Sequence, residues 1–348
     1  MSEKRLNVGI IGAGRIGKVH AETLAFRIPE AKPVAIVDTN LSVAQEVARR
    51  YGIAKVSADA DAILSDSKID TVLICSPTDT HADLVIRAAQ AGKHIFCEKP
   101  IDHGLARIDR ALAAVEKAAV KFQVGFNRRF DANFLRVRKS VTSGEIGTPH
   151  LMHIISRDPG PPPIAYIKVS GGIFLDMSIH DFDMARFLTG DEVESVFTAG
   201  AVRVDPEIGK AGDLDTAVTV LKFAGGVIAV IDNSRKAVYG YDQRVEILGS
   251  AGAIATENLF PNQAVISTAT EIRRDLPLNF FMERYTESFI HEMRSFVGAV
   301  LRDEPPEVNG SDGRMAVLIA LAARKSYDEA RPVSLTEVAK LQPSTILA

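Results

Sequence analysis

Two polar side chains, Asp176 and His180, stand in an apolar stretch and have types and spacing that suggest chemistry. They are four residues apart, so in a helix both project from one face, one turn apart. A carboxylate beside an imidazole in a water-poor place is a common way to hold a base near neutral pH. A capping aspartate and a buried structural histidine give the same pattern. The choice between the two interpretations depends on what else the chain brings to this place.

A glycine-rich turn follows the apolar, strand-like run 6–11 and precedes a helical pattern over 18–27. A G-x-G-x-x-G sequence in this context is typical of dinucleotide binding. Gly12 permits the tight turn, Gly14 lets the backbone approach a pyrophosphate, and Gly17 lets the helix pack on the strand. The helix N-terminus then offers free N–H groups to the phosphates. The predicted dinucleotide contacts are Gly12, Gly14, Arg15, Ile16 and Gly17.

Asp38 ends the next predicted strand, 33–37, about 20 residues after the last glycine, as in dinucleotide-binding folds. A carboxylate there accepts hydrogen bonds from the ribose hydroxyls of NAD and repels the 2′-phosphate of NADP. Thr39 and Asn40 follow, and no arginine stands directly after the aspartate. The sequence therefore predicts NAD as the cofactor, although a surface aspartate at a strand end is the simpler alternative.

Two later strand patterns, 71–75 and 94–97, end in turns that carry further polar residues. Turns at the carboxyl ends of parallel strands line the cofactor crevice. Pro100 restricts the residue before it to extended geometry and makes a cis bond accessible. A lysine fixed in this way can reach a ligand over the sheet, or it can be an ordinary solvated lysine. The cofactor contacts predicted from these turns are Ser76, Pro77, His81, Glu98 and Lys99, with a structural role for His81 as the alternative.

The elements that must position these residues fall into two domains. Strands and helices alternate up to residue 126, which predicts a doubly wound parallel sheet of the α/β class over residues 1–126. Beyond Gly190 the apolar period becomes two, which predicts a mostly antiparallel sheet with one face left for a partner. The second domain is predicted to span residues 127–348, including closing helices over 283–301 and 312–330.

Composition limits the classes of function. The chain has 348 residues, 46% of them hydrophobic and 24% charged, as in globular proteins. A net charge of −3 without a basic run gives no reason to expect nucleic acid or a membrane surface as partner. No apolar run reaches the length of a membrane span, and residues 1–5 leave no room for a signal peptide, so we expect a cytoplasmic protein. The two cysteines, Cys75 and Cys97, are predicted to be buried thiols, and no metal site is predicted.

With these residues in place, the chain resembles the glucose–fructose oxidoreductase / inositol dehydrogenase (Gfo/Idh/MocA) family over essentially its whole length. The marks are the glycine turn, Glu98-Lys99-Pro100 about 80 residues later, and the Asp176/His180 pair after Gly171-Gly172. The stretch from Ser156 to Pro159, together with residues 171–188, is similar to inositol 2-dehydrogenases. The resemblance implies an N-terminal Rossmann domain, and a C-terminal α/β domain whose open sheet makes dimer or tetramer contacts in a homo-oligomer.

The resemblance also implies roles for individual residues. Lys99 corresponds to the catalytic lysine that hydrogen-bonds the reacting hydroxyl, His180 to the base, and Asp176 to the carboxylate that orients the ring. The hydride passes from the substrate carbinol carbon to NAD, and no metal is required. A cyclic polyol needs many hydrogen-bond partners, and the implied substrate contacts are Lys99, Arg129, Arg157, Asp158, Asp176, His180 and Tyr239. Salt bridges, a loop cap and a core aromatic are equally good explanations of Arg129, Arg157, Asp158 and Tyr239.

The implied reaction is oxidation of myo-inositol to 2-keto-myo-inositol, as in inositol catabolism. Scyllo-inositol, chiro-inositol or an aldopyranose would use the same chemistry. A ligand sensor that keeps the Rossmann domain without catalysis is an alternative of a different class. Two departures concern the isomer: Ser156 stands where some inositol dehydrogenases have a histidine, and the proline-rich loop 158–163 is not general to the family.

Overall fold

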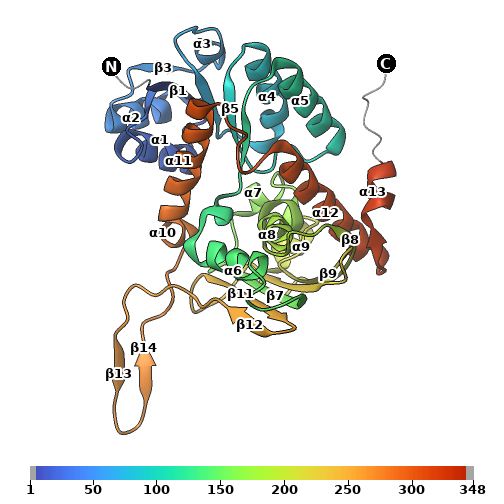
Figure 1. Cartoon of the computed structure of the whole chain (residues 1–348). Coiled ribbons are helices and arrows are strands. Elements are labelled where there is room, and N and C mark those ends of the chain that lie inside the picture. The colour runs from blue at the N-terminus through green and yellow to red at the C-terminus, as the bar shows by residue number, and fades with distance from the viewer. Residues whose placement is uncertain (1–4, 342–348) are drawn as a thin grey trace. The chain divides into compact units, whose positions relative to one another are not determined.

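The computed structural model describes residues 5–341, which form two compact units (Figure 1). The first comprises residues 5–130 and 287–317, and the second comprises residues 131–286 and 318–341. The first boundary lies four residues beyond the predicted one. The structure groups 287–317 with the first unit, whereas the sequence analysis places them in the second domain. None of the helices within 5–341 is both long and apolar enough to cross a bilayer.

The first unit is a parallel six-stranded sheet in the order β3-β2-β1-β4-β5-β6, which confirms the predicted doubly wound fold. Its core joins β1 and α1 to apolar side chains of α11, such as Met293 and Phe296. The elements are β1 (Leu6–Ile11), α1 (Arg15–Phe26), β2 (Ala31–Val37), α2 (Leu41–Tyr51), β3 (Lys55–Ser57), α3 (Asp61–Leu64), β4 (Thr71–Ile74), η1 (Thr78–Thr80), α4 (His81–Gln90), β5 (His94–Glu98), α5 (Leu105–Ala118), β6 (Phe122–Gly125), η2 (Asn127–Phe130) and α11 (Thr286–Arg302).

The second unit is a seven-stranded sheet in the order β12-β11-β7-β10-β9-β8-β15. Only the central pair, β7 and β10, is parallel, so the sheet is mostly antiparallel as predicted. Its elements are α6 (Ala132–Thr142), β7 (Pro149–Arg157), α7 (Ile164–Ile167), η3 (Phe174–Ser178), α8 (Ile179–Thr189), β8 (Val193–Ala201), α9 (Pro206–Lys210), β9 (Thr216–Phe223), β10 (Ile228–Ser234), β11 (Asp242–Gly249), β12 (Gly252–Ala255), β13 (Val265–Ser267), β14 (Ile272–Arg274), α10 (Phe281–Arg284), β15 (Val333–Ser334) and α13 (Leu335–Leu341). Helix α12 (Gly310–Glu329) begins in the first unit and ends in the second.

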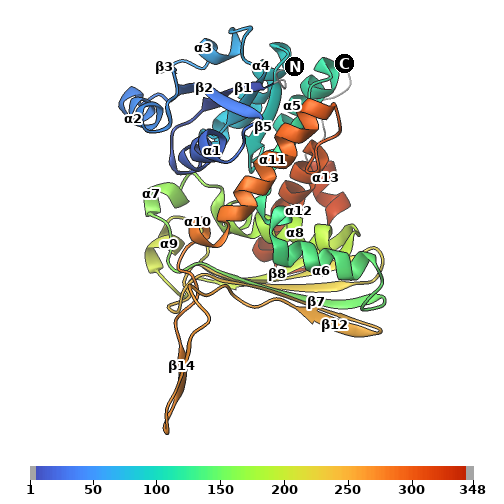
Figure 2. The same ribbon diagram turned by 60° about the vertical axis from the view of Figure 1, so that its left-hand side comes forward.

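Helices α6 and α8 cover one face of this sheet, and no helix within residues 5–341 covers the other (Figure 2). The side chains of the strands alternate accordingly. In β7, Met152 and Ile154 are buried, whereas Leu151, directly before Met152, is exposed. The hairpin of β13 and β14 extends away from the sheet (Figures 1 and 2). The uncovered side is called the open face here, and it is the face that the sequence predicts to be left for a partner.

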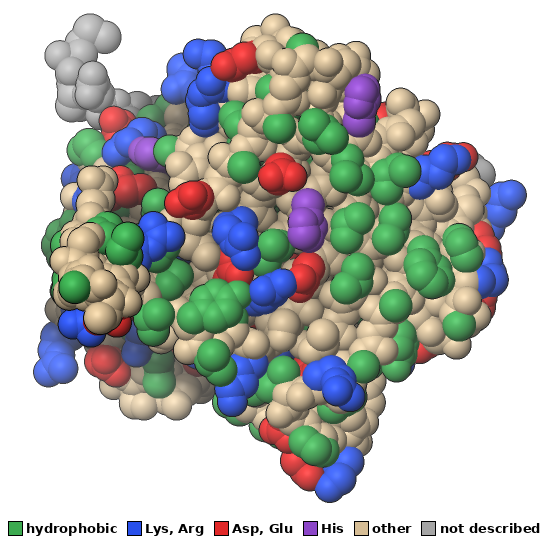
Figure 3. Space-filling model, turned by 90° about the horizontal axis from the view of Figure 1, so that it is seen from below, with side chains coloured by type: hydrophobic (Ala, Val, Ile, Leu, Met, Phe, Trp, Pro, Cys, Tyr) green, Lys and Arg blue, Asp and Glu red, His purple; other side chains and the backbone are tan. Residues whose placement is uncertain are grey.

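The open face carries a band of large apolar side chains (Figure 3). Leu151 on β7 pairs with Ile228 on one neighbouring strand and with Leu248 on the other, so the three lie side by side. Each of them is exposed by more than two-fifths, as is Val218 on β9. Charged side chains lie among them in Figure 3. An apolar band of this kind on one side of a sheet marks an interaction surface.

Candidate active site

The glycine turn between β1 and α1 has the geometry that a dinucleotide requires. Gly12 has a φ of 101°, and a Cβ there would lie 2.5 Å from the carbonyl oxygen of Cys75. A Cβ on Gly17 would lie 2.0 Å from the carbonyl oxygen of Gly12, so the helix can approach the turn only with glycine. Gly14, by contrast, has open space around it and no side chain caps the helix that follows. The first amides of α1 are therefore available to a pyrophosphate, and the residues fit NAD.

Asp38 stands directly after β2 and reaches back to this turn. Its Oδ2 accepts a hydrogen bond from the Ala13 amide at 2.8 Å, and its Oδ1 accepts one from the Asn40 amide at 2.8 Å. A carboxylate oxygen has two lone pairs, so each oxygen can still accept a ribose hydroxyl. The main-chain bonds fix the direction of the carboxylate, which fits the ribose contact predicted from the sequence.

The turn after β4 contacts His81, for which the sequence left a cofactor contact and a structural role open. Ser76 Oγ lies 2.6 Å from Thr80 Oγ1, and Pro77 leads into the short helix η1. The ring of His81 is buried, with Nδ1 2.8 Å from the Pro100 carbonyl oxygen and Nε2 2.8 Å from that of Ser76. Burial lowers the pKa of His81. A neutral imidazole has one N–H, so it donates a hydrogen bond to one of these two carbonyls and only contacts the other. The buried ring lies between two loops, which favours the structural role for His81.

The turn after β5 places Lys99 at the carboxyl end of the sheet. Its side chain is half-buried, and the bond between Lys99 and Pro100 is cis, which the proline permits. Glu98 points toward the interior, where its Oε1 lies 2.6 Å from Nε2 of the fully buried His20. A Cβ on Gly125 of β6 would lie 2.9 Å from the Glu98 carboxylate. Glu98 therefore contacts the protein core through this oxygen, and the predicted cofactor contact receives no support from its direction.

Asp176 and His180 lie in the second unit, on a nearly buried helical segment. Every residue from 173 to 185 is buried except these two, which are half-buried. The structure thus confirms that they share one face. The segment differs from the prediction in its first turn: η3 is π-helical and passes into α8 at Ile179. Single π-turns within α-helices are frequent at functional sites.

Each oxygen of the Asp176 carboxylate receives a hydrogen bond. Tyr166 donates its hydroxyl to Oδ1 at 2.9 Å, and Arg235 donates Nη1–H to Oδ2 at 3.1 Å. Tyr166 belongs to α7, which follows the proline-rich loop, so this loop does bring a side chain to the Asp176 helix. Arg235 follows β10 and is fully buried. Neither residue has a role predicted from the sequence, because nothing in their local pattern distinguishes them.

A buried polar network fastens the same helical segment to the sheet. Asn233 on β10 accepts a hydrogen bond from Ser178 Oγ at 2.7 Å and donates one to Asp181 Oδ2 at 2.8 Å. Its amide also donates to the Ser156 carbonyl oxygen, and Ser156 Oγ donates to Gln243 Oε1. Unpaired polar groups would be costly here, so these bonds define how the helix lies on the sheet. Ser156 is thus a structural residue of the covered face.

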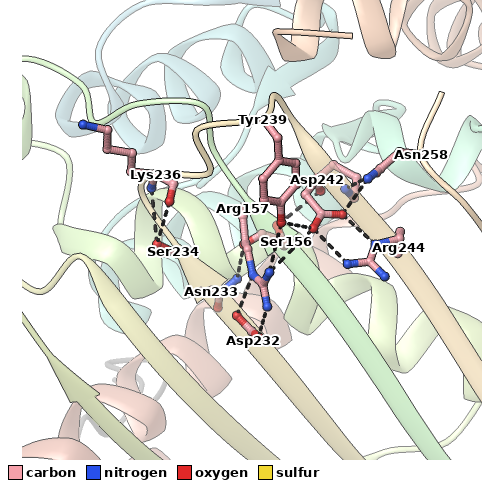
Figure 4. Close-up of polar contacts among 11 residues, drawn as sticks. Ser156, Arg157, Asp232, Asn233, Ser234, Lys236, Tyr239, Asp242, Arg244 and Asn258 are labelled. Atoms are coloured by element: carbon pink, nitrogen blue, oxygen red, sulfur yellow. Dashed lines mark hydrogen bonds and ion pairs between the residues drawn. The ribbon is translucent and has the colours of Figure 1, made fainter. Parts of the chain in front are cut away.

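Arg157 and Tyr239 lie on the opposite face of the sheet (Figure 4). Arg157 forms an ion pair with Asp232 and donates to Tyr239 Oη at 3.0 Å, and that hydroxyl donates to Asp242 Oδ2 at 2.6 Å. Arg157 is paired in register with Asp242, so their side chains share the open face. The structure therefore corrects their predicted place: both belong to an open-face network, whereas Asn233 and Ser156 face the helices.

Charges within this network are balanced by close contacts. Burial opposes ionisation of Asp242, but hydrogen bonds from Arg244, Tyr239 and Asn258 lower its pKa to about 2. Burial, together with the bond to Asp242, raises the pKa of Tyr239. The Asp232 carboxylate raises the pKa of Arg157 despite its partial burial. These groups compensate one another without a ligand.

The remaining predicted substrate residues are also engaged. Arg129 lies in the first unit, where its Nη2 is 3.0 Å from Asp312 Oδ1 at the start of α12. Asp158 joins the end of β7 to the segment after β10, since its amide donates to the Ser234 carbonyl and its carbonyl accepts from the Ala237 amide. Lys99 belongs to the first unit and Asp176 and His180 to the second, so the implied catalytic set is divided between the two units. Within residues 5–341, no three His, Cys, Asp or Glu side chains form a group able to hold a metal ion.

Two family models match the chain. The oxidoreductase family with an NAD-binding Rossmann fold matches residues 6–126, and the GFO/IDH/MocA C-terminal domain matches residues 134–255. These two matches correspond to the parallel sheet with the glycine turn and to most of the second unit.

Similar proteins cover nearly the whole chain. It is 50% identical to a myo-inositol 2-dehydrogenase of Thermotoga maritima, over 96% of this chain and 99% of that protein. It is 48% identical to an inositol 2-dehydrogenase of Rhizobium meliloti, over 94% and 98% of the two chains. The crystal structure of a Lactobacillus casei scyllo-inositol dehydrogenase with bound NAD(H) and scyllo-inositol is 31% identical, with a TM-score of 0.90 over 96% and 100%. The chain belongs to the Gfo/Idh/MocA family of NAD-binding oxidoreductases.

Proposed function

We propose that this protein oxidises myo-inositol at one secondary hydroxyl to the keto-inositol, with NAD as hydride acceptor. The observation that carries the proposal is the pair of half-buried residues, Asp176 and His180, on a helical segment that is otherwise fully buried. The glycine turn and Asp38 of the first unit fit the cofactor. Relatives of about 50% identity that are named as inositol 2-dehydrogenases support the choice of substrate.

In the proposed reaction, His180 takes the proton of the reacting hydroxyl as general base. Lys99 hydrogen-bonds the same oxygen and stabilises the negative charge that develops on it. Asp176 orients the imidazole ring, and the hydrogen bonds from Tyr166 and Arg235 fix the direction of its carboxylate. When bound, NAD supplies the acceptor for the hydride that leaves the carbinol carbon.

The isomer is the less constrained part of the proposal. Scyllo-inositol is the second candidate, because a similar crystal structure contains that polyol together with NAD(H). Chiro-inositol and aldopyranoses complete the set to be compared. Since Arg157 and Tyr239 are engaged on the open face, discrimination between ring hydroxyls is assigned to Lys99, Asp176, His180 and their neighbours.

We also propose a homo-oligomer, a dimer or tetramer, formed through the open face of the second unit. The apolar band of Leu151, Ile228 and Leu248 supports this, because a copy seated there would remove these side chains from water. We also propose that the protein is located in the cytoplasm, as expected from the sequence.

The deciding experiment is a comparison of initial rates with NAD across myo-, scyllo- and chiro-inositol and a set of aldopyranoses. The highest kcat/KM is expected with myo-inositol, and NADP should be a poorer acceptor. No activity on any inositol would refute the proposed substrate class. Tight polyol binding with no NADH formation under any condition would instead favour the non-catalytic sensor.

A further inference from the structure

A buried arginine connects Asp176 to a part of the second unit that has no place in the proposed chemistry. The side chain of Arg235 is only 1% exposed. Its Nη1 donates to Asp176 Oδ2 at 3.1 Å, and its Nη2 donates to Asp213 Oδ2 at 3.3 Å. One guanidinium group therefore bridges two carboxylates. The planar fork of arginine suits this bridge, which the single ammonium group of lysine cannot reproduce.

Asp213, the far end of the bridge, is itself fixed. Its Oδ1 accepts the amide of Ile173 at 2.9 Å, at the start of the segment that carries Asp176. A Cβ on Gly172 would lie 2.7 Å from the same oxygen, and Gly172 has a φ of 80°. Gly172 therefore makes room for Asp213. Asp213 therefore accepts a hydrogen bond from the beginning of the segment, and Arg235 donates one to the Asp176 carboxylate within it.

The main chain at Arg235 is also held in place. Its amide donates to the Asp215 carbonyl at 2.8 Å. The Asp215 carboxylate in turn accepts the amides of Arg203, Val204 and Asp205 at 2.7 to 3.0 Å. These bonds join the end of β10 to the segments around α9. The main chain at Arg235 is thus held by hydrogen bonds and its side chain is buried, so the position of the guanidinium group is well defined.

Charge explains why the bridge matters. Asp176 and Asp213 are two acidic groups in a largely buried place, and Arg235 is the cation between them. Removal of one partner from a buried ion pair leaves an uncompensated charge that must move or be neutralised. Without Arg235, Asp176 would lose the donor on Oδ2, while Tyr166 would still bind Oδ1. Its carboxylate would then be free to turn away from His180.

We infer that Arg235 is a positioning residue for the dehydrogenase reaction, and that it acts by holding Asp176 in the orientation that the reaction needs, with Asp213 as its anchor. The inference rests on the proposed function, since it assigns to Asp176 a role in that reaction. Arg235 touches neither substrate nor cofactor in this role. Its effect must therefore pass through Asp176.

A double-mutant cycle tests this dependence. In Arg235→Met, which preserves much of the volume, kcat is expected to fall about 10²-fold, the scale of loss when a reacting group is misplaced by about 1 Å. The KM for NAD should stay within about twofold, because the cofactor contacts lie in the first unit. In an Asp176→Asn background, the same Arg235→Met change should alter kcat by less than about threefold, since the carboxylate that Arg235 aligns is absent.

Two further arms separate positioning from stability. Guanidinium ion at tens of millimolar should restore part of the activity of Arg235→Ala and none to Asp176→Asn, whereas Arg235→Lys should stay impaired. Arg284→Met is the matched control, because Arg284 forms a similarly buried ion pair in the same unit, with Asp131 in place of Asp176. It should lower the melting temperature and leave the kcat of the folded enzyme within about threefold of the wild type.

The possible results are distinct. Additive losses in the cycle, or a loss in Arg284→Met as large as in Arg235→Met, would overturn the inference and leave the proposed function standing. Absence of guanidinium rescue together with additive losses would assign Arg235 to stability alone. A wild type that oxidises no inositol would remove the proposed function, and the inference would fall with it.

Discussion

At the scale of single residues, Asp176 shows how a carboxylate is prepared for a task. Tyr166 and Arg235 each donate a hydrogen bond to one of its oxygens, which fixes the direction of the carboxylate. His20 and Glu98 show the opposite case, since their 2.6 Å contact lies inside the protein directly before Lys99 in the chain. Of two residues adjacent in the sequence, Glu98 can thus point into the core while Lys99 stands at the proposed active site.

Lys99→Met should reduce kcat by at least about 10²-fold, because the positive charge that stabilises the developing oxyanion is lost. NAD binding should survive, since the glycine turn and Asp38 are unchanged. Steady-state kinetics and calorimetric titration with NAD measure the two effects. Turnover near the wild-type value would show that Lys99 lacks the role given to it.

Asp38→Ala should reduce the ratio of kcat/KM for NAD to that for NADP by about 10-fold or more, the worth of a hydrogen bond to a charged group. The carboxylate also supports the Ala13 amide, so Asp38→Asn serves as the control that keeps an acceptor there. Both variants should tolerate NADP better than the wild type, because both lack the repelling charge. An unchanged preference in both would refute the ribose contact.

At the scale of elements, the sequence predicts well where the pattern is local. The strands of the first sheet follow from short apolar runs, and the glycine turn follows from its spacing. The π-turn at 174–178 was not predicted, because it depends on how Asp213 and Asn233 hold that segment from other parts of the chain. The sequence predicts the wrong domain for residues 287–317 for a similar reason. Helical periodicity shows that a helix has an apolar face, but it does not show which domain that face packs against.

The faces of strands near their ends were harder to predict. Arg157, Asp158 and Tyr239 were grouped around the substrate by resemblance, yet Arg157 and Tyr239 lie on the open face. Alternation along β7 would have given this result, since Met152, Ile154 and Ser156 are the buried set and Arg157 is out of phase with them. The resemblance was therefore reliable for the motifs and unreliable for side-chain direction beyond them.

Helix α11 contributes a testable pH effect to the first unit. Burial, and next the charge of Glu98, raise the pKa of Glu292 well above its usual range. The native state then holds a proton that the unfolded state releases near pH 4.3, so stability present below that pH declines as the pH rises toward the native pKa. Cys75 and the His20–Glu98 pair are the other titratable groups at this place.

Glu292→Gln should remove this decline. Between pH 5 and pH 8 its melting temperature is expected to fall less than that of the wild type, and the variant should be the more stable protein at the alkaline end. Thermal unfolding across this range measures the effect. The control is Glu287→Gln on the same helix, whose side chain is 65% exposed and should leave the pH dependence unchanged. Parallel curves for the wild type and Glu292→Gln would contradict the assignment.

At the scale of the whole molecule, the open face combines two kinds of surface. Leu151, Ile228 and Leu248 form an apolar band across three strands, and the Arg157 network is charged but internally balanced. A second copy of the chain can cover the apolar band without leaving an unpaired charge in the Arg157 network. The surface therefore suits a symmetric contact between identical chains.

Leu151→Glu places a charge in the middle of that band. If the protein assembles through the open face, the variant should shift toward monomer, because each contact would bury an unpaired carboxylate. Light scattering coupled to size-exclusion chromatography measures the mass. Phe26→Glu, at an exposed position on α1 in the first unit, is the matched control. A monomeric wild type, or a Leu151→Glu variant that assembles normally, would argue against this interface.

The close approach of Gly172 to Asp213 has a consequence for the natural history of the chain. A side chain at 172 would collide with the carboxylate that anchors Arg235, so each of the three residues limits what evolution can place at the other two. Homologous sequences should therefore inherit glycine, aspartate and arginine at these positions as a set. Because Gly172 also has a φ of 80°, glycine is favoured there in any case, so the informative pair is Asp213 and Arg235. A large alignment in which these two vary independently would show that the constraint is absent.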